Sequence, residues 1–140
     1  MIKHKYDFQE PSTPIYSFED NNDYVYDVAW SPIHPSLFAS VDGEGRLDLW
    51  NLINDSEIPT ASICFNNGQS ALNKLKWTKC GNKIAIGDDL GKVSIVDVNE
   101  NISRPKVDDS KKLTNTLNEL KQNYIDLQEI HGINKSISYF

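Results

Sequence analysis

Two stretches of this 140-residue sequence match each other and decide the fold. Residues 41–52 read VDGEGRLDLWNL, and residues 87–98 read GDDLGKVSIVDV. When the two stretches are aligned at an offset of 46 residues, Asp42 aligns with Asp88 and Trp50 aligns with Val96. A glycine followed by a basic residue occurs at the same place in both stretches, as Gly45-Arg46 and as Gly91-Lys92. A unit that returns after about 40–50 residues is typical of repeat architectures, in which each unit is one small supersecondary structure.

Each repeat is predicted to form short strands. Residues 24–30, YVYDVAW, alternate in polarity and are rich in β-branched and aromatic side chains, and prolines interrupt the pattern directly afterwards. Trp30 in this segment matches Trp77 at an offset of 47. The strands expected in the first repeat are 24–30, 37–41, 47–52 and 59–65, and those expected in the second are 72–77, 83–86 and 92–98. The second repeat has no fourth strand in this pattern, and a partial strand at 14–18 precedes the first repeat.

Recurring sets of four strands with a tryptophan near the end of the third are typical of β-propeller blades. The sequence therefore predicts an all-β fold, a partial propeller of about two four-stranded antiparallel blades, followed by a C-terminal helix. A β-sandwich with chance self-similarity is the alternative. The expected organisation is a polar segment at 1–13, a partial propeller at 14–103 with blades at about 19–65 and 66–103, and a helix and tail at 104–140.

The tail has a different periodicity. Asp108, Asp109 and Ser110 supply acids and a cap for a helix start, and Gly132 is expected to end a helix of roughly 20 residues. Apolar residues follow at spacings of 4, 3, 4 and 3, namely Leu113, Leu117, Leu120, Tyr124 and Leu127. Such a stripe either docks on its own propeller or binds a partner.

Composition excludes several classes of protein. Lys and Arg number 14 and Asp and Glu number 20, and within 14–73 Arg46 is the one basic residue against nine acids. A nucleic-acid or anionic membrane surface needs clustered cations, so neither is expected as a partner. No run of 18 or more apolar residues is present, so no membrane span is expected, and residues 1–7 do not look like a signal peptide. Cys64 and Cys80 form no CxxC pair, and the expected compartment is the reducing cytosol.

The dipeptide Trp50-Asn51 closes a WD-type third strand, and an ordered set of segments around it narrows the resemblance. These segments are 16–21 (YSFEDN), 23–32 (DYVYDVAWSP), 41–52, 59–63 (PTASI) and 71–78 (ALNKLKWT). Together they resemble the C-terminal WD-repeat blades of the cytoplasmic dynein intermediate chain. The resemblance covers roughly residues 14–99 and fades beyond about 120.

The resemblance implies a non-catalytic subunit of a microtubule motor, located in the cytoplasm with the cytoskeleton-associated dynein complex, whose propeller binds the dynein heavy chain beside other subunits. The family's N-terminal region that carries light-chain sites has no counterpart in these residues, so light-chain binding is not expected. Two blades are too few to close a ring of four to eight, which indicates a fragment or truncated form. The polar network common in WD repeats is incomplete, so the blades are expected to depend on apolar packing of Trp30, Trp50 and Trp77.

An incomplete propeller leaves open sheet edges and an apolar blade face, and such surfaces recruit partners or aggregate. The expected partner contacts are Trp50, Lys74, Lys76, Leu113, Leu117, Leu120, Tyr124 and Leu127. Lys74 and Lys76 alternate with Leu75 and Trp77, so they share one face of a strand, which is either a solvated surface or a contact for an acidic helix.

No catalytic, cofactor or metal site is expected. His4, His34 and His131 lie far apart and none pairs with a cysteine at ligand spacing. Asp42 and Asp88 are expected at equivalent hairpin turns rather than in one pocket. A scaffold subunit of the dynein complex is therefore the first hypothesis, a WD-repeat adaptor outside the motor is the alternative, and an enzyme is disfavoured because no convergent polar residues are found.

Overall fold

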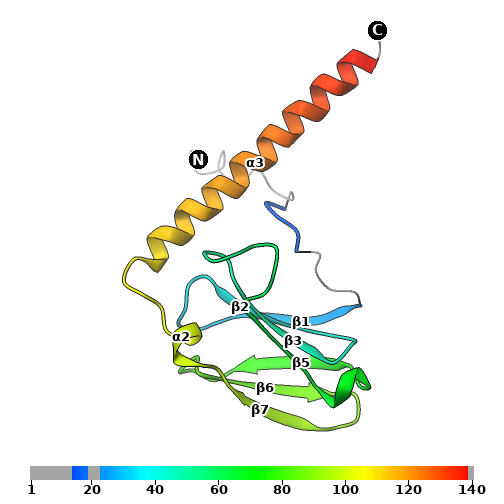
Figure 1. The fold of residues 1–140 in the computed structure, drawn as a ribbon, viewed down its shortest axis with the longest axis vertical. Coiled ribbons are helices and arrows are strands. Elements are labelled where there is room, and N and C mark those ends of the chain that lie inside the picture. The colour runs from blue at the N-terminus through cyan, green and yellow to red at the C-terminus, as the bar shows by residue number, and fades with distance from the viewer. Residues whose placement is uncertain (1–13, 19–22, 139–140) are drawn as a thin grey trace, which may run out of the picture. The chain divides into compact units, whose positions relative to one another are not determined.

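The computed structural model describes residues 14–18 and 23–138 (Figure 1). Residues 18–116 form one compact unit with two antiparallel sheets, and a second unit contains residues 14–17 and the helix from Leu117 onward. The elements are β1 (Val25–Trp30), β2 (Leu37–Asp42), β3 (Arg46–Asn51), β4 (Ala61–Cys64), η1 (Asn66–Gly68), β5 (Leu72–Trp77), β6 (Lys83–Asp88), β7 (Val93–Asp97), α2 (Glu100–Ser103) and α3 (Asp109–Ser138).

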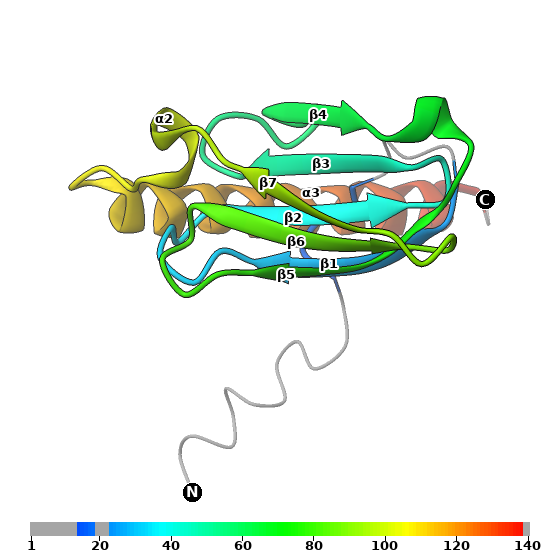
Figure 2. The same ribbon diagram turned by 90° about the horizontal axis from the view of Figure 1, so that it is seen from below.

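The first sheet is an antiparallel meander in the order β1-β2-β3-β4 (Figure 2). Its central hairpin turns at the repeated segment, where Gly45 has a φ of 77° that a side chain would make costly. Asp42 fixes this turn, because its Oδ1 atom accepts the backbone N–H groups of Glu44 and Arg46, each at 3.0 Å. The predicted turn role of Asp42 is therefore what the structure shows.

The second sheet repeats the arrangement with three strands in the order β5-β6-β7. Its hairpin turn has the same chemistry, since Asp88 Oδ1 accepts the N–H groups of Leu90 and Lys92 at 3.0 and 2.8 Å, and Gly91 has a φ of 85°. The sequence predicts no fourth strand after β7, and in the structure residues 100–103 form the short helix α2, with the Asn99 side chain accepting the N–H of Asn101 at 2.9 Å. The described part of this blade thus has three strands and not four.

The core lies between the two sheets, which pack face to face as neighbouring blades. Leu47 and Leu49 of the first sheet are buried there with Ile84 and Ile86 of the second. The other buried members are Leu37, Ala39, Val41, Leu72, Leu75, Trp77 and Val98. Each side chain of this size stabilises the fold by about 1.5–3 kcal/mol through burial, so the sheets are expected to hold each other in place.

Two predictions about the tail and the tryptophans need correction. The helix does not end at Gly132 but continues to Ser138, since one glycine costs a helix only about 1 kcal/mol and a stop needs the chain to leave the helical path. Trp50 and Trp77 are buried as expected, whereas Trp30 has 58% of its surface exposed. Trp30 lies on the side of the first sheet that faces away from the second, so the shared core does not cover it.

Candidate partner-binding surface

The residues predicted to contact a partner fall in three different settings. Lys74 and Lys76 lie on the exposed side of the second sheet, and the apolar stripe of the tail lies along α3. Trp50 has only 1% of its surface exposed, so in this structure it packs inside the first blade. The lysines and the helix are therefore the predicted contacts that a partner could reach directly.

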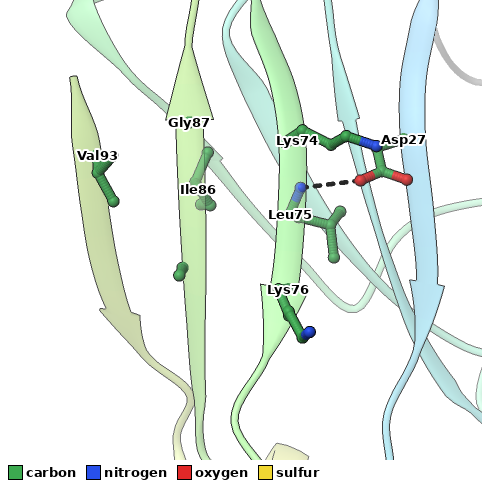
Figure 3. A pocket seen from close by; sticks show the side chains of 8 residues that line it. Asp27, Lys74, Leu75, Lys76, Ile86, Gly87 and Val93 are labelled. Atoms are coloured by element: carbon green, nitrogen blue, oxygen red, sulfur yellow. Dashed lines mark hydrogen bonds between the residues drawn. The ribbon is translucent and has the colours of Figure 1, made fainter. Parts of the chain in front are cut away.

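We define the second-sheet free face as the side of β5–β7 that points away from the core. Its members are Lys74, Lys76, Ala85, Gly87, Val93 and Ile95, which the strand register places on one side of the sheet. A shallow hollow of about 460 Å³ lies over this face, with Asp27 at its border (Figure 3). Val93 and Ile95 are 70% and 64% exposed, an unusual position for large apolar side chains on neighbouring positions of one face.

Asp27 joins the two sheets at the edge of this hollow. Its Oδ2 atom accepts the backbone N–H of Leu75 at 2.9 Å (Figure 3). Its Oδ1 atom accepts the backbone N–H of Val28 at 2.9 Å. A second bond between the sheets runs from Trp77 Nε1, which donates to the carbonyl oxygen of Ala29 at 3.0 Å. These two bonds fix how β5 lies on β1 and so fix where Lys74 and Lys76 point.

The first sheet also presents a side that the core does not use. We define the first-sheet free face by Val28, Trp30, Phe38 and Trp50, which the register places on one side. The rings form a continuous series, with Trp30 edge-on to Phe38 at 5.2 Å between centroids and Phe38 stacked on Trp50 at 6.1 Å. Phe18 packs edge-on against both Phe38 and Trp50, at 5.2 and 5.0 Å. Trp30 and Val28 are left at the exposed end of this series.

The stripe on α3 is graded in exposure. Leu113, Leu117, Leu120 and Tyr124 are half-buried, and Leu127 is exposed. Their spacing keeps them on one side of the helix, as the sequence predicted. Ile125 and Ile130 add two further exposed apolar side chains to α3.

A buried contact that the sequence did not predict ties the start of α3 to the first blade. His34, interpreted from sequence as a turn residue, is 3% exposed, and its Nε2 atom lies 3.3 Å from Asp109 Oδ2. Its Nδ1 atom accepts the N–H of Ser36 at 3.3 Å, so the proton of the neutral ring belongs on Nε2. Burial lowers the pKa of His34 below its ordinary value of 6.5, and the charge of Asp109 opposes this by raising it. No local pattern could have shown this contact, because 75 residues separate the two side chains.

This buried cluster includes a serine but cannot work as a nucleophilic site. Ser36 is fully buried and donates its hydroxyl proton to Asn51 Oδ1 at 2.7 Å, so no substrate could reach it. Across the described residues, no group of three or more His, Cys, Asp or Glu side chains could hold a metal ion. In the same part of the chain, no helix is long and apolar enough to cross a membrane.

A second buried polar group lies in the first hairpin. Arg46 Nε lies 3.0 Å from Asp48 Oδ2 and 3.6 Å from Asp42 Oδ2, and both carboxylates are fully buried. Asp48 also accepts the hydroxyl of Ser62, which connects β3 to β4. Trp50 Nε1 donates to Ser40 Oγ at 3.3 Å, whereas Ile86 and Val96 occupy the matching places in the second repeat. The second blade therefore has no counterpart of this polar bond.

The comparisons with known proteins agree with this geometry. No family model matches the chain. Over 113 residues, 81% of its length, the chain is 55% identical to a cytoplasmic dynein 1 intermediate chain of Drosophila melanogaster. The chain is a relative of the cytoplasmic dynein intermediate chains. It spans 17% of the length of that fly protein.

Two further matches support the relationship and the fold. This dynein intermediate-chain relative is 32% identical over 83 residues to cytoplasmic dynein 2 intermediate chain 2 of Mus musculus, covering 59% of the chain and 16% of the mouse protein. The WD40 domain of Toxoplasma gondii coronin superposes with a TM-score of 0.53 at 27% identity, covering 61% of the chain and 20% of the coronin chain. The predicted fold, a partial WD-repeat propeller with a C-terminal helix, is therefore confirmed.

Proposed function

We propose that this chain is a non-catalytic scaffold segment of a cytoplasmic dynein complex, and that its blades and α3 bind the dynein heavy chain in microtubule-based transport. The observation that carries the proposal is the 55% identity to the fly cytoplasmic dynein 1 intermediate chain over 81% of the chain. The proposal places the chain in the cytoplasm with the cytoskeleton-associated complex and its other subunits.

The second-sheet free face supports this role by its chemistry. Two exposed cations, Lys74 and Lys76, border an apolar hollow. Such a surface suits an amphipathic helix with acidic residues beside its apolar stripe, since the carboxylates would meet the lysines while the apolar side chains fill the hollow. The stripe of α3, from Leu113 to Leu127, offers a second apolar surface for helix pairing.

The role of Lys74 and Lys76 in heavy-chain binding can be tested by affinity purification of the tagged chain from cells, with the recovered heavy chain quantified by mass spectrometry. Lys74→Glu combined with Lys76→Glu is expected to reduce heavy-chain recovery by about tenfold or more, equivalent to about 1.4 kcal/mol. Lys79→Glu combined with Lys92→Glu is the matched control, because both of its lysines are exposed and the change in charge is the same. Equal recovery with the two double variants would remove Lys74 and Lys76 from the interface.

The helix is tested separately in the same assay. Leu117→Asp combined with Leu120→Asp places charges on the stripe, whereas Asn115→Asp combined with Asn118→Asp places the same charges on exposed positions of α3. We expect heavy-chain recovery to fall only with the leucine variant. Trp50 is not substituted, because it is buried and its loss would damage the first blade itself.

The alternative function is a WD-repeat adaptor outside the motor complex. The similarity to the WD40 domain of coronin shows that this fold also occurs outside dynein intermediate chains. The same purification separates the two functions, because reproducible recovery of other subunits without heavy chain would favour the adaptor.

A further inference from the structure

A second hollow, of about 390 Å³, lies where the first blade, the second blade and the short helix α2 meet. This volume falls within the range of small-molecule sites, about 300–1,000 Å³. All of its walls belong to the compact unit of residues 18–116. Its polar lining residues are Cys80, Asn82, Asp97, Glu100, Ser103 and Arg104. The hollow therefore brings together a thiol, an amide, a hydroxyl, two carboxylates and a guanidinium group.

The turn that carries Cys80 is packed closely against the first blade. The next residue, Gly81, has a φ of 69°, and a methyl group built on it would lie 2.5 Å from Cγ1 of Ile33. On the other side of the turn, Val98 donates its N–H to the carbonyl of Asn82 at 2.8 Å, which joins the turn to the chain just before α2. These two contacts fix the turn, so an exposed thiol stands at a defined place beside the hollow.

Ser103 gives the hollow a polar group that the chain itself does not use. The residue is 2% exposed and lines the hollow from α2. Its N–H is donated to the carbonyl of Asn99 at 2.9 Å, whereas its hydroxyl has no hydrogen-bond partner among the described residues. No fully enclosed side-chain oxygen or nitrogen in that part of the chain lacks a partner, so this hydroxyl opens onto the hollow. It can therefore bond to a ligand there, and such a bond is worth more where water is largely excluded.

Charged groups of both signs surround the hollow. Arg104 Nη2 lies 3.6 Å from Glu100 Oε1, and Asp97 pairs with Lys83. All four side chains are exposed, and exposed ion pairs are held weakly, so each charge is free to turn to a ligand. The hollow therefore suits a small zwitterion, whose carboxylate would meet the guanidinium group and whose ammonium group would meet a carboxylate.

Cys64, the other cysteine of the sequence, has a different setting. It is exposed at the end of β4, and its thiol donates to the carbonyl oxygen of Glu44 at 3.9 Å. Residues 14–73, which contain Cys64, have one basic residue against nine acids. Residues 74–99, which contain Cys80, have five lysines against three aspartates. An anionic reagent is therefore attracted towards Cys80 and repelled from Cys64.

We propose that Cys80 is a site of reversible S-glutathionylation, and that the hollow beside α2 holds the glutathione moiety. Glutathione is the small thiol that keeps reducing compartments reduced. It is a zwitterionic tripeptide in which carboxylates outnumber ammonium groups, so its charge matches that of the hollow and of the surrounding segment. Arg104 meets one of its carboxylates, and the Ser103 hydroxyl bonds to one of its amide groups.

The reaction is a thiol–disulfide exchange. The Cys80 thiol gives its proton to solvent, and the thiolate attacks one sulfur of glutathione disulfide. A new disulfide forms between Cys80 and that sulfur, the original disulfide breaks, and the other half leaves as a glutathione thiolate. Cys80 is thus oxidised while one glutathione is reduced. Reduced glutathione reverses the reaction by the same exchange.

The test compares two single-thiol variants of the purified chain, Cys64→Ser, which keeps Cys80, and Cys80→Ser, which keeps Cys64. Each reduced variant is mixed with excess glutathione disulfide, and intact-protein mass spectrometry follows formation of the mixed disulfide with time. The same rate is measured with hydroxyethyl disulfide, an uncharged reagent that reports the exposure and reactivity of each thiol. We expect the ratio of the two rate constants, glutathione disulfide over hydroxyethyl disulfide, to be about tenfold or more higher at Cys80 than at Cys64.

Substitutions in the hollow test whether its walls cause the preference. In the variant that keeps Cys80, Arg104→Gln and Ser103→Ala are each expected to lower the ratio by about threefold or more. Lys111→Gln removes an exposed cation that does not line the hollow, so it is the matched control for Arg104→Gln and should leave the ratio unchanged. Circular dichroism verifies folding, and Asn82→Ala replaces Ser103→Ala if that variant is unfolded.

Two outcomes would overturn the proposal. An equal ratio at the two cysteines means that Cys80 is an exposed thiol only. A higher ratio at Cys80 that survives both Arg104→Gln and Ser103→Ala assigns the preference to the charge of the whole segment and not to the hollow. The reactions use the purified chain alone, so their result is independent of heavy-chain binding, on which the proposed function depends.

Discussion

At the scale of single residues, the Asp27 carboxylate holds the backbone of the second sheet. Asp27→Ala leaves the N–H of Leu75 without its acceptor, and the free energy of unfolding is expected to fall by about 1–3 kcal/mol. Asp89→Ala, at an exposed turn position, is the matched control and should change the free energy of unfolding by less than about 0.5 kcal/mol. Urea denaturation measures both, and equal effects would mean that the Asp27 bond adds no stability.

His34 makes stability depend on pH. Because its pKa in the folded chain is lowered below 6.5, the unfolded chain takes up the proton first as the pH falls. Well above pH 6.5 the titration of His34 therefore adds nothing to the free energy of unfolding. As the pH falls through that value, the free energy of unfolding decreases. We expect His34→Gln, which keeps a donor and an acceptor but does not titrate, to lose this part of the slope between about pH 5 and pH 8. Parallel profiles for the two proteins would contradict the assignment.

At the scale of elements, the first hairpin depends on Arg46. Arg46→Leu leaves two buried carboxylates, Asp42 and Asp48, without the cation beside them, and breaking such a buried pair costs about 3–5 kcal/mol. Lys92→Leu makes the same change at the matched position of the second hairpin, where the side chain is exposed, and should have little effect. Thermal denaturation of both variants checks the difference. A similar loss in the two would show that the Arg46 cluster does not stabilise the hairpin.

Most of the strands could be predicted from sequence because their pattern is local. Leu72–Trp77 was predicted with its observed bounds, and the aspartate–glycine turns repeat with the same hydrogen bonds. Gly132 misled the prediction, because a glycine within a long helix is tolerated. The His34–Asp109 contact and the exposure of Trp30 depend on which surfaces the folded chain brings together, and no local pattern contains that information.

At the scale of the whole molecule, the shared core predicts that the two sheets unfold together. Ile84→Ala removes a fully buried side chain from the second sheet and should lower stability by about 2–5 kcal/mol. Because Ile84 packs in the core shared with Leu47 and Leu49, we expect tryptophan fluorescence and circular dichroism to give one coincident transition in the variant. Two separate transitions would show that the sheets are independent.

The position of β4 has a consequence for cleavage of the backbone. The exposed segment between β3 and β4, which includes Asn54, Glu57 and Ile58, is open to proteases. A nick there leaves β4 covalently joined to the second sheet while its hydrogen bonds still hold it in the first. The two pieces would remain interlocked and migrate as one particle until a denaturant separates them.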